Sequence, residues 1–250
     1  MTRFTDQVAI ITGGASGIGE ATAKQISKEG GTVALFDVQE DKLATVKAEI
    51  ESSGGTVSTH IVDISNEENV SSAVSEVISQ HSKIDILVNS GGIVGQTGTK
   101  IEDYDAETFD KVIAVNLRGP FLMAKYVIRE MVKRDYGRVM LIASIAGKDG
   151  NPAMCGYTSS KAGCIGLVKG LGKEYATTNI TINGLAPAVI RTPMNADCTD
   201  EQNAYMIAKI PMGRLGTIDE AASVITYAVS KECSFTTGFI FDLSGGRTVY

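Results

Sequence analysis

Tyr157 and Lys161 are the residues of this chain whose types and spacing most directly predict chemistry. Residues four apart lie on one face of a helix, so the Lys161 ammonium can sit near the Tyr157 phenol and favour its anion. A tyrosine without such a neighbour keeps its proton at neutral pH and cannot act as a base. Ser144 precedes the pair after an apolar segment and can hold a reacting oxygen. Together the three residues predict a site for hydride transfer, with the tyrosine handling the proton.

A glycine-rich turn, Gly13-Gly-Ala-Ser-Gly-Ile-Gly19, follows the first apolar segment and leads into a helical pattern. Glycines between a strand and a helix let the backbone approach a pyrophosphate closely, and the amides of the helix N-terminus then face the phosphates. Such turns also occur merely to tighten a strand–helix joint. The position of this one, at the very start of the fold, favours dinucleotide binding. The expected contacts in the turn are Gly13, Ser16, Gly17, Ile18 and Gly19.

Asp37 stands at the end of the second apolar segment. A carboxylate at this position accepts hydrogen bonds from the adenosine ribose hydroxyls and repels a 2′-phosphate. The alternative is a solvated loop charge. Neither Ser16 nor Val38 supplies a positive charge for a phosphate, so the sequence predicts NAD rather than NADP.

Short β-branched segments alternate with longer amphipathic stretches, which is typical of parallel strands joined by helices. The pattern predicts an α/β protein: a single Rossmann-fold domain spanning 1–250, with a doubly wound, seven-stranded parallel sheet. Only the segment 191–216 fits no such alternation, and its prolines and glycines predict a cover over the substrate site. The strands are expected at 8–12, 32–36, 57–62, 84–88, 138–143, 180–186 and 238–243. The helices are expected at 17–29, 40–52, 67–80, 106–134, 157–176 and 219–230.

Parallel sheets bind ligands at the carboxyl ends of their strands, so the residues just after each strand are candidates for the site. Asp63 follows the third predicted strand. It either holds the adenine amino group or caps the helix that follows. The sequence leaves both alternatives open.

Composition limits the partners. With 250 residues, 43% of them hydrophobic, the chain can bury a large core. The net charge is −6 without a long run of Lys or Arg, which favours a small-molecule partner over nucleic acid or a membrane surface. Four cysteines without C-x-x-C spacing and two histidines predict free thiols and no metal site. A polar N-terminus and the lack of an apolar run of about eighteen residues predict a cytoplasmic protein.

The motifs, taken in chain order, resemble those of the short-chain dehydrogenase/reductase family over essentially the whole length. The resemblance implies that Tyr157 is the acid/base, that Lys161 supports it and binds the nicotinamide ribose, that Ser144 orients the substrate oxygen, and that Asn116 anchors a proton-relay water. It also implies a homotetramer, built through 106–134, 157–176 and the C-terminal strand edge. The motifs are Thr12-Gly-Gly-Ala-Ser-Gly-Ile-Gly19, Asp63, Asn89-Ser-Gly-Gly92, Asn116, Ser144, Tyr157 with Lys161, and Pro187-Ala-Val-Ile-Arg-Thr192. Further cofactor contacts are expected at Ile64, Asn89, Gly91, Pro187, Ile190 and Thr192.

Two motifs depart from the family pattern. The usual Asn-Asn-Ala-Gly is Asn89-Ser-Gly-Gly92 here, which keeps the first asparagine and loses the one that supports the sheet. The usual Pro-Gly after the sixth strand is Pro187-Ala188, so Ala188 must adopt a conformation compatible with its Cβ.

The segment 147–154, between Ser144 and Tyr157, is expected to line the substrate pocket. Its polar side chains suit the hydroxyls or the carboxylate of a sugar-derived substrate, although surface solvation explains Lys148 equally well. Cys155 has no neighbouring histidine in the sequence, which disfavours a catalytic thiol. The expected substrate contacts are Gln96, Lys148, Asn151, Arg191 and Met194.

The sequence therefore predicts an NAD-dependent dehydrogenase of a secondary alcohol, such as a sugar, polyol or sugar acid. The first alternative is a 3-oxoacyl-(acyl-carrier-protein) reductase. Such reductases tend to carry an arginine where this chain has Ser16, and basic docking residues where it has Asp135 and Thr178. The second alternative is a catalytically silent dinucleotide-binding regulator, because a fold alone does not establish activity.

Overall fold

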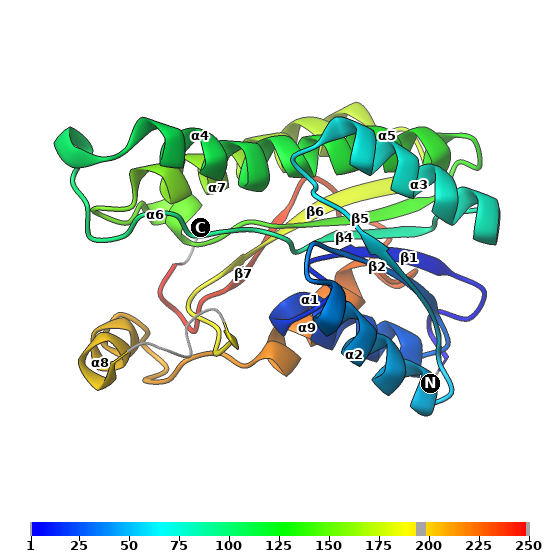
Figure 1. The fold of residues 1–250 in the computed structure, drawn as a ribbon, viewed down its shortest axis with the longest axis horizontal. Coiled ribbons are helices and arrows are strands. Elements are labelled where there is room, and N and C mark those ends of the chain that lie inside the picture. Colours follow the sequence, from blue (N-terminus) through cyan, green and yellow to red (C-terminus); the bar gives the residue numbers. More distant parts are fainter. Residues whose placement is uncertain (1, 194–198, 249–250) are drawn as a thin grey trace.

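The computed structural model describes residues 2–193 and 199–248. Seven parallel strands form one sheet between two layers of helices (Figure 1). The strands are β1 (Val8–Thr12), β2 (Thr32–Asp37), β3 (Thr56–Ile61), β4 (Ile86–Asn89), β5 (Gly137–Ile142), β6 (Ile180–Pro187) and β7 (Ile240–Leu243). Their order across the sheet is β3-β2-β1-β4-β5-β6-β7. The predicted doubly wound, seven-stranded sheet is confirmed.

One helical layer holds α1, α2 and α9, and the other holds α3, α4, α5 and α7 (Figure 1). Two shorter helices, α6 and α8, follow β5 and β6, at the end of the sheet where those strands finish. The helices are α1 (Gly17–Lys28), α2 (Glu40–Ser52), α3 (Glu67–His81), α4 (Ala106–Ile113), α5 (Gly119–Val132), α6 (Ala146–Asp149), α7 (Cys155–Glu174), α8 (Asp200–Ala208) and α9 (Ile218–Ala228). Within these ranges, none is long and apolar enough to cross a membrane.

The central strands β1, β2, β4, β5 and β6 are buried on both faces, which explains why they are largely apolar, whereas the edge strands β3 and β7 are partly exposed. Side chains alternate between the faces. Along β1, Val8 and Ile10 pack with the α3 and α5 layer, whereas Ala9 and Ile11 pack with the α1 and α9 layer. The two apolar cores fix the register of the sheet and thereby place the carboxyl ends of the strands along one edge.

The predicted helix over 106–134 is helical from Ala106 to Val132, but it is not a regular α-helix. A π-helical turn, Ala114–Arg118, separates α4 from α5. Pro120 has no N–H to donate to the Asn116 carbonyl four residues earlier, so the α-helical ladder cannot continue there. The Gly119 N–H instead donates to the carbonyl of Ala114, five residues earlier. The interruption places Asn116 inside the protein.

The segment 191–216 leaves the sheet after β6 and contains α8. Its two ends meet, because the Arg191 N–H donates to the Gly216 carbonyl (2.9 Å) and the Gly216 N–H donates to the Val189 carbonyl (3.1 Å). The segment therefore leaves and rejoins the body at one place, and it also contacts the C-terminal segment, where the Met212 N–H donates to the Gly245 carbonyl (3.1 Å). Its role as a substrate cover stays a prediction.

Candidate active site

The glycine turn packs backbone against backbone. Gly13 and Gly17 have φ angles of 66° and 58°, which favour glycine. A Cβ on Gly19 would lie 2.2 Å from the Gly13 carbonyl oxygen, and one on Gly13 would lie 2.8 Å from the Gly91 nitrogen. Side chains at these positions would therefore push apart the strand, the turn and the segment after β4.

The N-terminus of α1 offers its amides to a ligand. Its N-cap, Ser16, makes no side-chain capping bond, as in α2 and α7 and unlike α3, α4, α8 and α9, which side-chain oxygens cap. The first amides of a helix need acceptors, and the helix dipole favours a negative one. The turn and this helix end therefore fit the pyrophosphate of a dinucleotide.

Asp37 ends β2 beside the glycine turn and is buried. Its Oδ2 accepts a hydrogen bond from the Ala15 N–H (3.2 Å), and its Oδ1 accepts one from the Gln39 N–H (3.1 Å). The alternative of a solvated loop charge is therefore wrong. The carboxylate is fixed next to the pyrophosphate cradle, where a ribose would follow.

Asp63 does not cap the following helix. Its Oδ1 accepts hydrogen bonds from the Ser65 N–H (2.9 Å) and Oγ (2.7 Å), within its own turn. The cap of α3 is Asn66, whose side chain accepts from the backbone of Glu68 and Asn69. The capping alternative is wrong, and the adenine contact stays a prediction.

The segment after β4 closes the cradle from the other side. The Gly91 N–H donates to the Thr12 Oγ (3.0 Å), and Ile64 lies buried against Gly91 and Gly119. Asn89 is buried, and its Oδ1 has no hydrogen-bond partner among the described residues. Gly91 therefore lies against Gly13 of the glycine turn, Ile64 packs on Gly91, and Asn89 pairs with Thr12 at the end of β1.

Lys161 joins α7 to the end of β5. Its buried ammonium donates to the Ile142 carbonyl (2.8 Å), two residues before Ser144, and lies 5.7 Å from the centre of the Tyr157 ring. Ser144 is buried, and its Oγ accepts a hydrogen bond from the Ala146 N–H (3.1 Å). A Cβ on Gly147 would lie 2.6 Å from the Lys161 carbonyl carbon, so α6 packs directly on α7. The serine, the lysine and the tyrosine are thus held by one local framework.

Asn116 ties the π-helical turn to the segment after β4. Its Nδ2 donates to the Ile93 carbonyl (2.7 Å), and its Oδ1 accepts from the Ile93 N–H (2.8 Å). The same Nδ2 donates to Ser160 Oγ (3.2 Å), which itself donates to the Tyr157 carbonyl (2.7 Å). A Cβ on Gly92 would lie 3.1 Å from Asn116 Oδ1 and 3.6 Å from Lys161 Nζ. The asparagine and the lysine therefore flank the same glycine.

The carboxyl end of β6 also contributes to the candidate site. The Pro187 carbonyl accepts from the Ile145 N–H (3.1 Å), which places it beside Ser144. A Cβ on Gly17 would lie 3.6 Å from Thr192 Cγ2, so Thr192 lies over the glycine turn. Ile190 is buried and pairs with Gly216.

Ala188 needs no glycine conformation. It is not among the described residues with positive φ, and its N–H donates to the Leu243 carbonyl (2.9 Å). The departure from the family's Pro-Gly therefore leaves the backbone unstrained.

The predicted substrate contacts have different surroundings. The Gln96 side-chain oxygen accepts from the Asp105 N–H (3.0 Å) at the start of α4. Lys148 is not a solvated surface charge, because its side chain is 8% exposed and its ammonium lies 3.0 Å from Asp242 Oδ2. Arg191 is exposed. Met194 lies outside the described residues.

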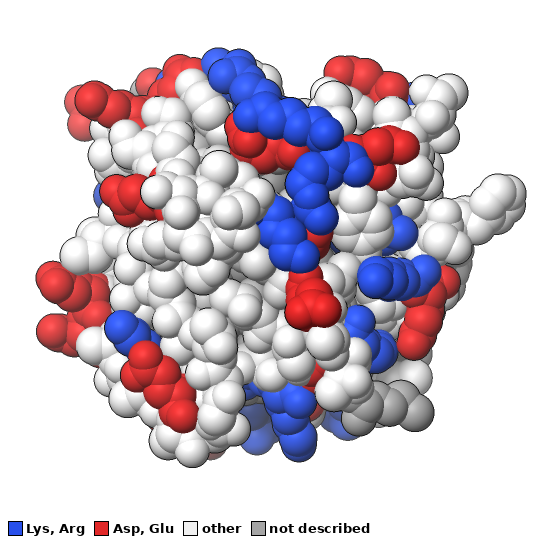
Figure 2. All heavy atoms as spheres, turned by 90° about the vertical axis from the view of Figure 1, so that its right-hand side faces the viewer, with Lys and Arg blue, Asp and Glu red and all other residues white. Residues whose placement is uncertain are grey.

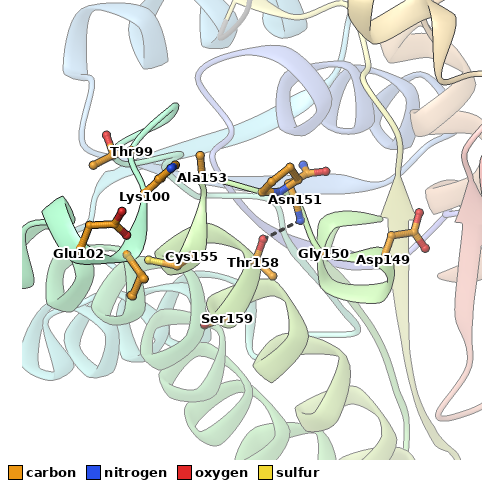
Figure 3. A pocket seen from close by; sticks show the side chains of 12 residues that line it. Thr99, Lys100, Glu102, Asp149, Gly150, Asn151, Ala153, Cys155, Thr158 and Ser159 are labelled. Carbon is orange, nitrogen blue, oxygen red and sulfur yellow. Dashed lines mark hydrogen bonds between the residues drawn. The ribbon is translucent and has the colours of Figure 1, made fainter.

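A hollow of about 690 Å³ lies beside the segment 149–153 (Figure 3). The segment is attached to α7 through the Asn151 N–H, which donates to Thr158 Oγ (3.2 Å), and Ala153 adopts a φ of 58°. Tyr157 and Ser144 are not among the lining residues. It is lined by Thr99, Lys100, Ile101, Glu102, Asp149, Gly150, Asn151, Pro152, Ala153, Cys155, Thr158 and Ser159.

Three residues of the site escaped the sequence-based prediction. Thr12 was only part of a motif, and Ser160 lies in the tyrosine–lysine run, where its spacing of three from Tyr157 was a usable signal. Arg247 gave no signal. It reaches Asn151 only because β7 ends beside α6.

Comparison with known proteins agrees with this geometry. The family model for short chain dehydrogenases matches residues 7–203. The chain is 42% identical over 250 residues to the 2-dehydro-3-deoxy-L-rhamnonate dehydrogenase (NAD+) of Sphingomonas sp. (strain SKA58), covering 99% of this chain and 98% of that protein. It is 35% identical to a 3-oxoacyl-(acyl-carrier-protein) reductase of Thermotoga maritima, covering 99% of this chain and all of that protein.

Among solved structures, that of an NAD+-bound xylitol dehydrogenase superposes with a TM-score of 0.91 at 29% identity, covering 97% of this chain and 99% of the other. The fold and the site define an NAD(P)-binding oxidoreductase that acts on CH–OH groups. The chain belongs to the short-chain dehydrogenase family.

Proposed function

We propose that the protein is an NAD-dependent dehydrogenase that oxidises a secondary hydroxyl of a sugar acid. The observation that carries the proposal is the joining of Lys161, beside the Tyr157 ring, to the strand end that bears Ser144. The sugar-acid class is supported by the 42% identity to a dehydrogenase of 2-dehydro-3-deoxy-L-rhamnonate along nearly the whole chain.

In the proposed reaction, Ser144 Oγ holds the substrate hydroxyl and the Tyr157 phenolate takes its proton. The positive charge of Lys161 supports that phenolate. NAD+, when bound, supplies the acceptor for the hydride, so the electron pair of the carbon–hydrogen bond leaves with the hydrogen and the alcohol becomes a ketone. The proton passes from Tyr157 to solvent, which balances the reaction. The same steps in reverse reduce the ketone to the alcohol.

Asp37 supports NAD as the preferred cofactor. Its buried carboxylate beside the glycine turn accepts two backbone hydrogen bonds, and a second negative charge from a 2′-phosphate would be repelled there. Asp37→Asn keeps an acceptor but removes the charge. We expect kcat/KM to fall roughly tenfold or more with NAD and to rise with NADP. An unchanged cofactor preference would make Asp37 a purely structural residue.

The charge pairs of α5 favour a small substrate over an acyl-carrier protein. Figure 2 shows the side of the molecule with the amino ends of the strands, opposite the candidate site, where Lys and Arg side chains lie next to Asp and Glu. On α5, Lys133 pairs with Glu130 (2.6 Å) and Lys125 pairs with Glu67 (2.7 Å). An acidic carrier would be better served by a uniformly basic face.

A substrate panel separates the two activities. NADH formation is measured with 2-dehydro-3-deoxy-L-rhamnonate, other sugar acids, polyols and cyclic alcohols, and NADPH consumption is measured with a 3-oxoacyl thioester. We expect turnover of a sugar acid with NAD. Turnover of the thioester alone would replace the proposed function with the acyl reductase, whose Thermotoga maritima member is 35% identical to this chain.

We also propose that the protein assembles as a homotetramer and that the β7 edge forms one of its interfaces. β7 ends the sheet, and exposed aromatic side chains gather near it: Phe235, Phe239 and Tyr227 are 103%, 52% and 43% exposed. Exposed aromatic side chains at a sheet edge favour burial against a second copy. Light scattering should give four chains, and Phe239→Glu should lower the mass. A monomeric wild type would contradict the proposal.

A further inference from the structure

The segment between β3 and α3 carries two of the expected cofactor contacts, Asp63 and Ile64. It leaves the sheet beside Asp37, because the Val62 N–H donates to the Asp37 carbonyl (2.9 Å). The Asn66 N–H then donates to the Asp63 carbonyl (3.0 Å), which closes a tight turn before α3 begins. The tight turn thus places Asp63 and Ile64 next to the strand end whose carboxylate is expected to bind the ribose.

Arg118 and Gly119, where the π-helical turn meets α5, hold this tight turn from the other side. A Cβ on Gly119 would lie 2.9 Å from Ile64 Cδ1, so the buried Ile64 side chain lies directly on the Gly119 backbone. The Arg118 Nη1 donates to the Ser65 carbonyl. Its Nη2 lies 3.7 Å from Glu67 Oε2, at the start of α3. The guanidinium therefore bridges the tight turn and the first residue of the helix.

The contact with the Ser65 carbonyl is the one that fixes the tight turn. The Arg118 side chain is 48% exposed, and an ion pair between exposed side chains contributes little. A hydrogen bond from a charged donor to a backbone carbonyl, in contrast, is strong and restrains the main chain itself. Together with the packing of Ile64 on Gly119, it holds the tight turn at two successive residues.

Lys125 of α5 shows the contrast. Its ammonium pairs with the same Glu67 carboxylate (2.7 Å), and its side chain is 37% exposed. Within the part of the chain that the structure describes, this ammonium donates to Glu67 alone. The two cations share one partner, but only Arg118 reaches the Ser65 carbonyl.

We propose that Arg118 is a positioning residue for the adenine end of NAD, and that it acts by holding the tight turn that carries Asp63 and Ile64. The inference rests on the proposed use of NAD, because the arginine acts on the cofactor only through that turn. Asn116, two residues earlier, ties the same π-helical turn to the segment after β4. The π-helical turn thus serves the reacting end of the site through Asn116 and the adenine end through Arg118.

The test measures the adenine end without the reaction. The probe is ADP-ribose, which carries the adenine and the pyrophosphate but no nicotinamide, and its Kd is measured by isothermal titration calorimetry. In Arg118→Met, which keeps an unbranched stem but loses the donors, Kd should rise roughly three- to tenfold. KM for NAD should rise by the same factor, whereas kcat with saturating NAD and the sugar acid should stay within about twofold.

The matched control is Lys125→Met, which removes the other cation paired with Glu67 and should leave Kd for ADP-ribose within about twofold. An equal Kd in the two variants would overturn the inference and leave NAD binding in place. A fall in kcat as large as the rise in Kd would assign Arg118 to holding the π-helical turn as a whole and would also overturn it. A wild type that binds neither ADP-ribose nor NAD would refute the proposed NAD-dependent function and the inference together.

Discussion

Removing the Asn116 amide tests how the site is held. The side chain is 1% exposed and makes three hydrogen bonds, two to the backbone of Ile93 and one to Ser160. Asn116→Ala leaves the Ile93 N–H and carbonyl without these partners, at about 1–2 kcal/mol each because they are partly buried. The free energy of unfolding should therefore fall by about 2–4 kcal/mol, which lowers the melting temperature of a chain of this length by roughly 5–15 °C.

The assay is thermal unfolding followed by circular dichroism, with turnover measured on the same protein. Asn116→Asp keeps an acceptor for the Ile93 N–H but loses the donors, so its melting temperature should lie between those of the wild type and the alanine variant. The matched control is Asn69→Ala, an exposed asparagine of α3. If Asn116→Ala melts with the control, the Asn116 side chain does not hold the segment around Ile93.

Three further outcomes are expected. Gly19→Ala should abolish the rise in melting temperature that NAD gives, because the new Cβ would lie 2.2 Å from the Gly13 carbonyl oxygen. The control Gly166→Ala, which has open space at its Cβ, should keep that rise. A rise with NAD in the Gly19 variant would contradict the assignment of the glycine turn to NAD binding. Burial lowers the pKa of His81 below its ordinary 6.5. As the pH drops past that value, the unfolded chain binds more protons than the folded one, and the stability falls. His81→Gln should therefore flatten the dependence of melting temperature on pH between 7.5 and roughly 5.5, and an unchanged slope would contradict the burial of His81. Burial raises the pKa of the Cys164 thiol, so peptide mapping should find it unmodified after native treatment with iodoacetamide; rapid labelling would show that α7 opens.

The strands were predictable because short segments rich in β-branched and apolar residues mark them in the sequence. β1 occupies the predicted 8–12, and the other strands begin and end within two residues of their predicted bounds. Short, β-branched runs that alternate with longer helical patterns are typical of the strands of a parallel sheet. The break at Ala114–Arg118 was not predicted, because the helical spacing of apolar residues continues through it. The π-helical turn depends on Pro120 and on the Asn116 side chain, whose hydrogen-bond partners, Ile93 and Ser160, are distant in sequence.

In the candidate site, too, some features could be predicted from the sequence and others could not. Ser144, Lys161 and Asp37 were predictable because they stand at strand ends or at a helical spacing. The pairing of Lys148 with Asp242 and the reach of Arg247 to Asn151 were not, since each joins residues more than ninety positions apart. These contacts depend on the position of β7 in the folded sheet. The local pattern of residues around each partner does not reveal that position.

The most direct test of the proposed chemistry is the turnover of Tyr157→Phe with NAD and the sugar acid that the wild type oxidises. The variant removes only the hydroxyl, so NAD should still raise its melting temperature. Loss of the proton acceptor should lower kcat by roughly 10²–10⁴-fold. Turnover at the wild-type rate, with NAD bound as before, would show that Tyr157 is not the acid/base and would contradict the central claim.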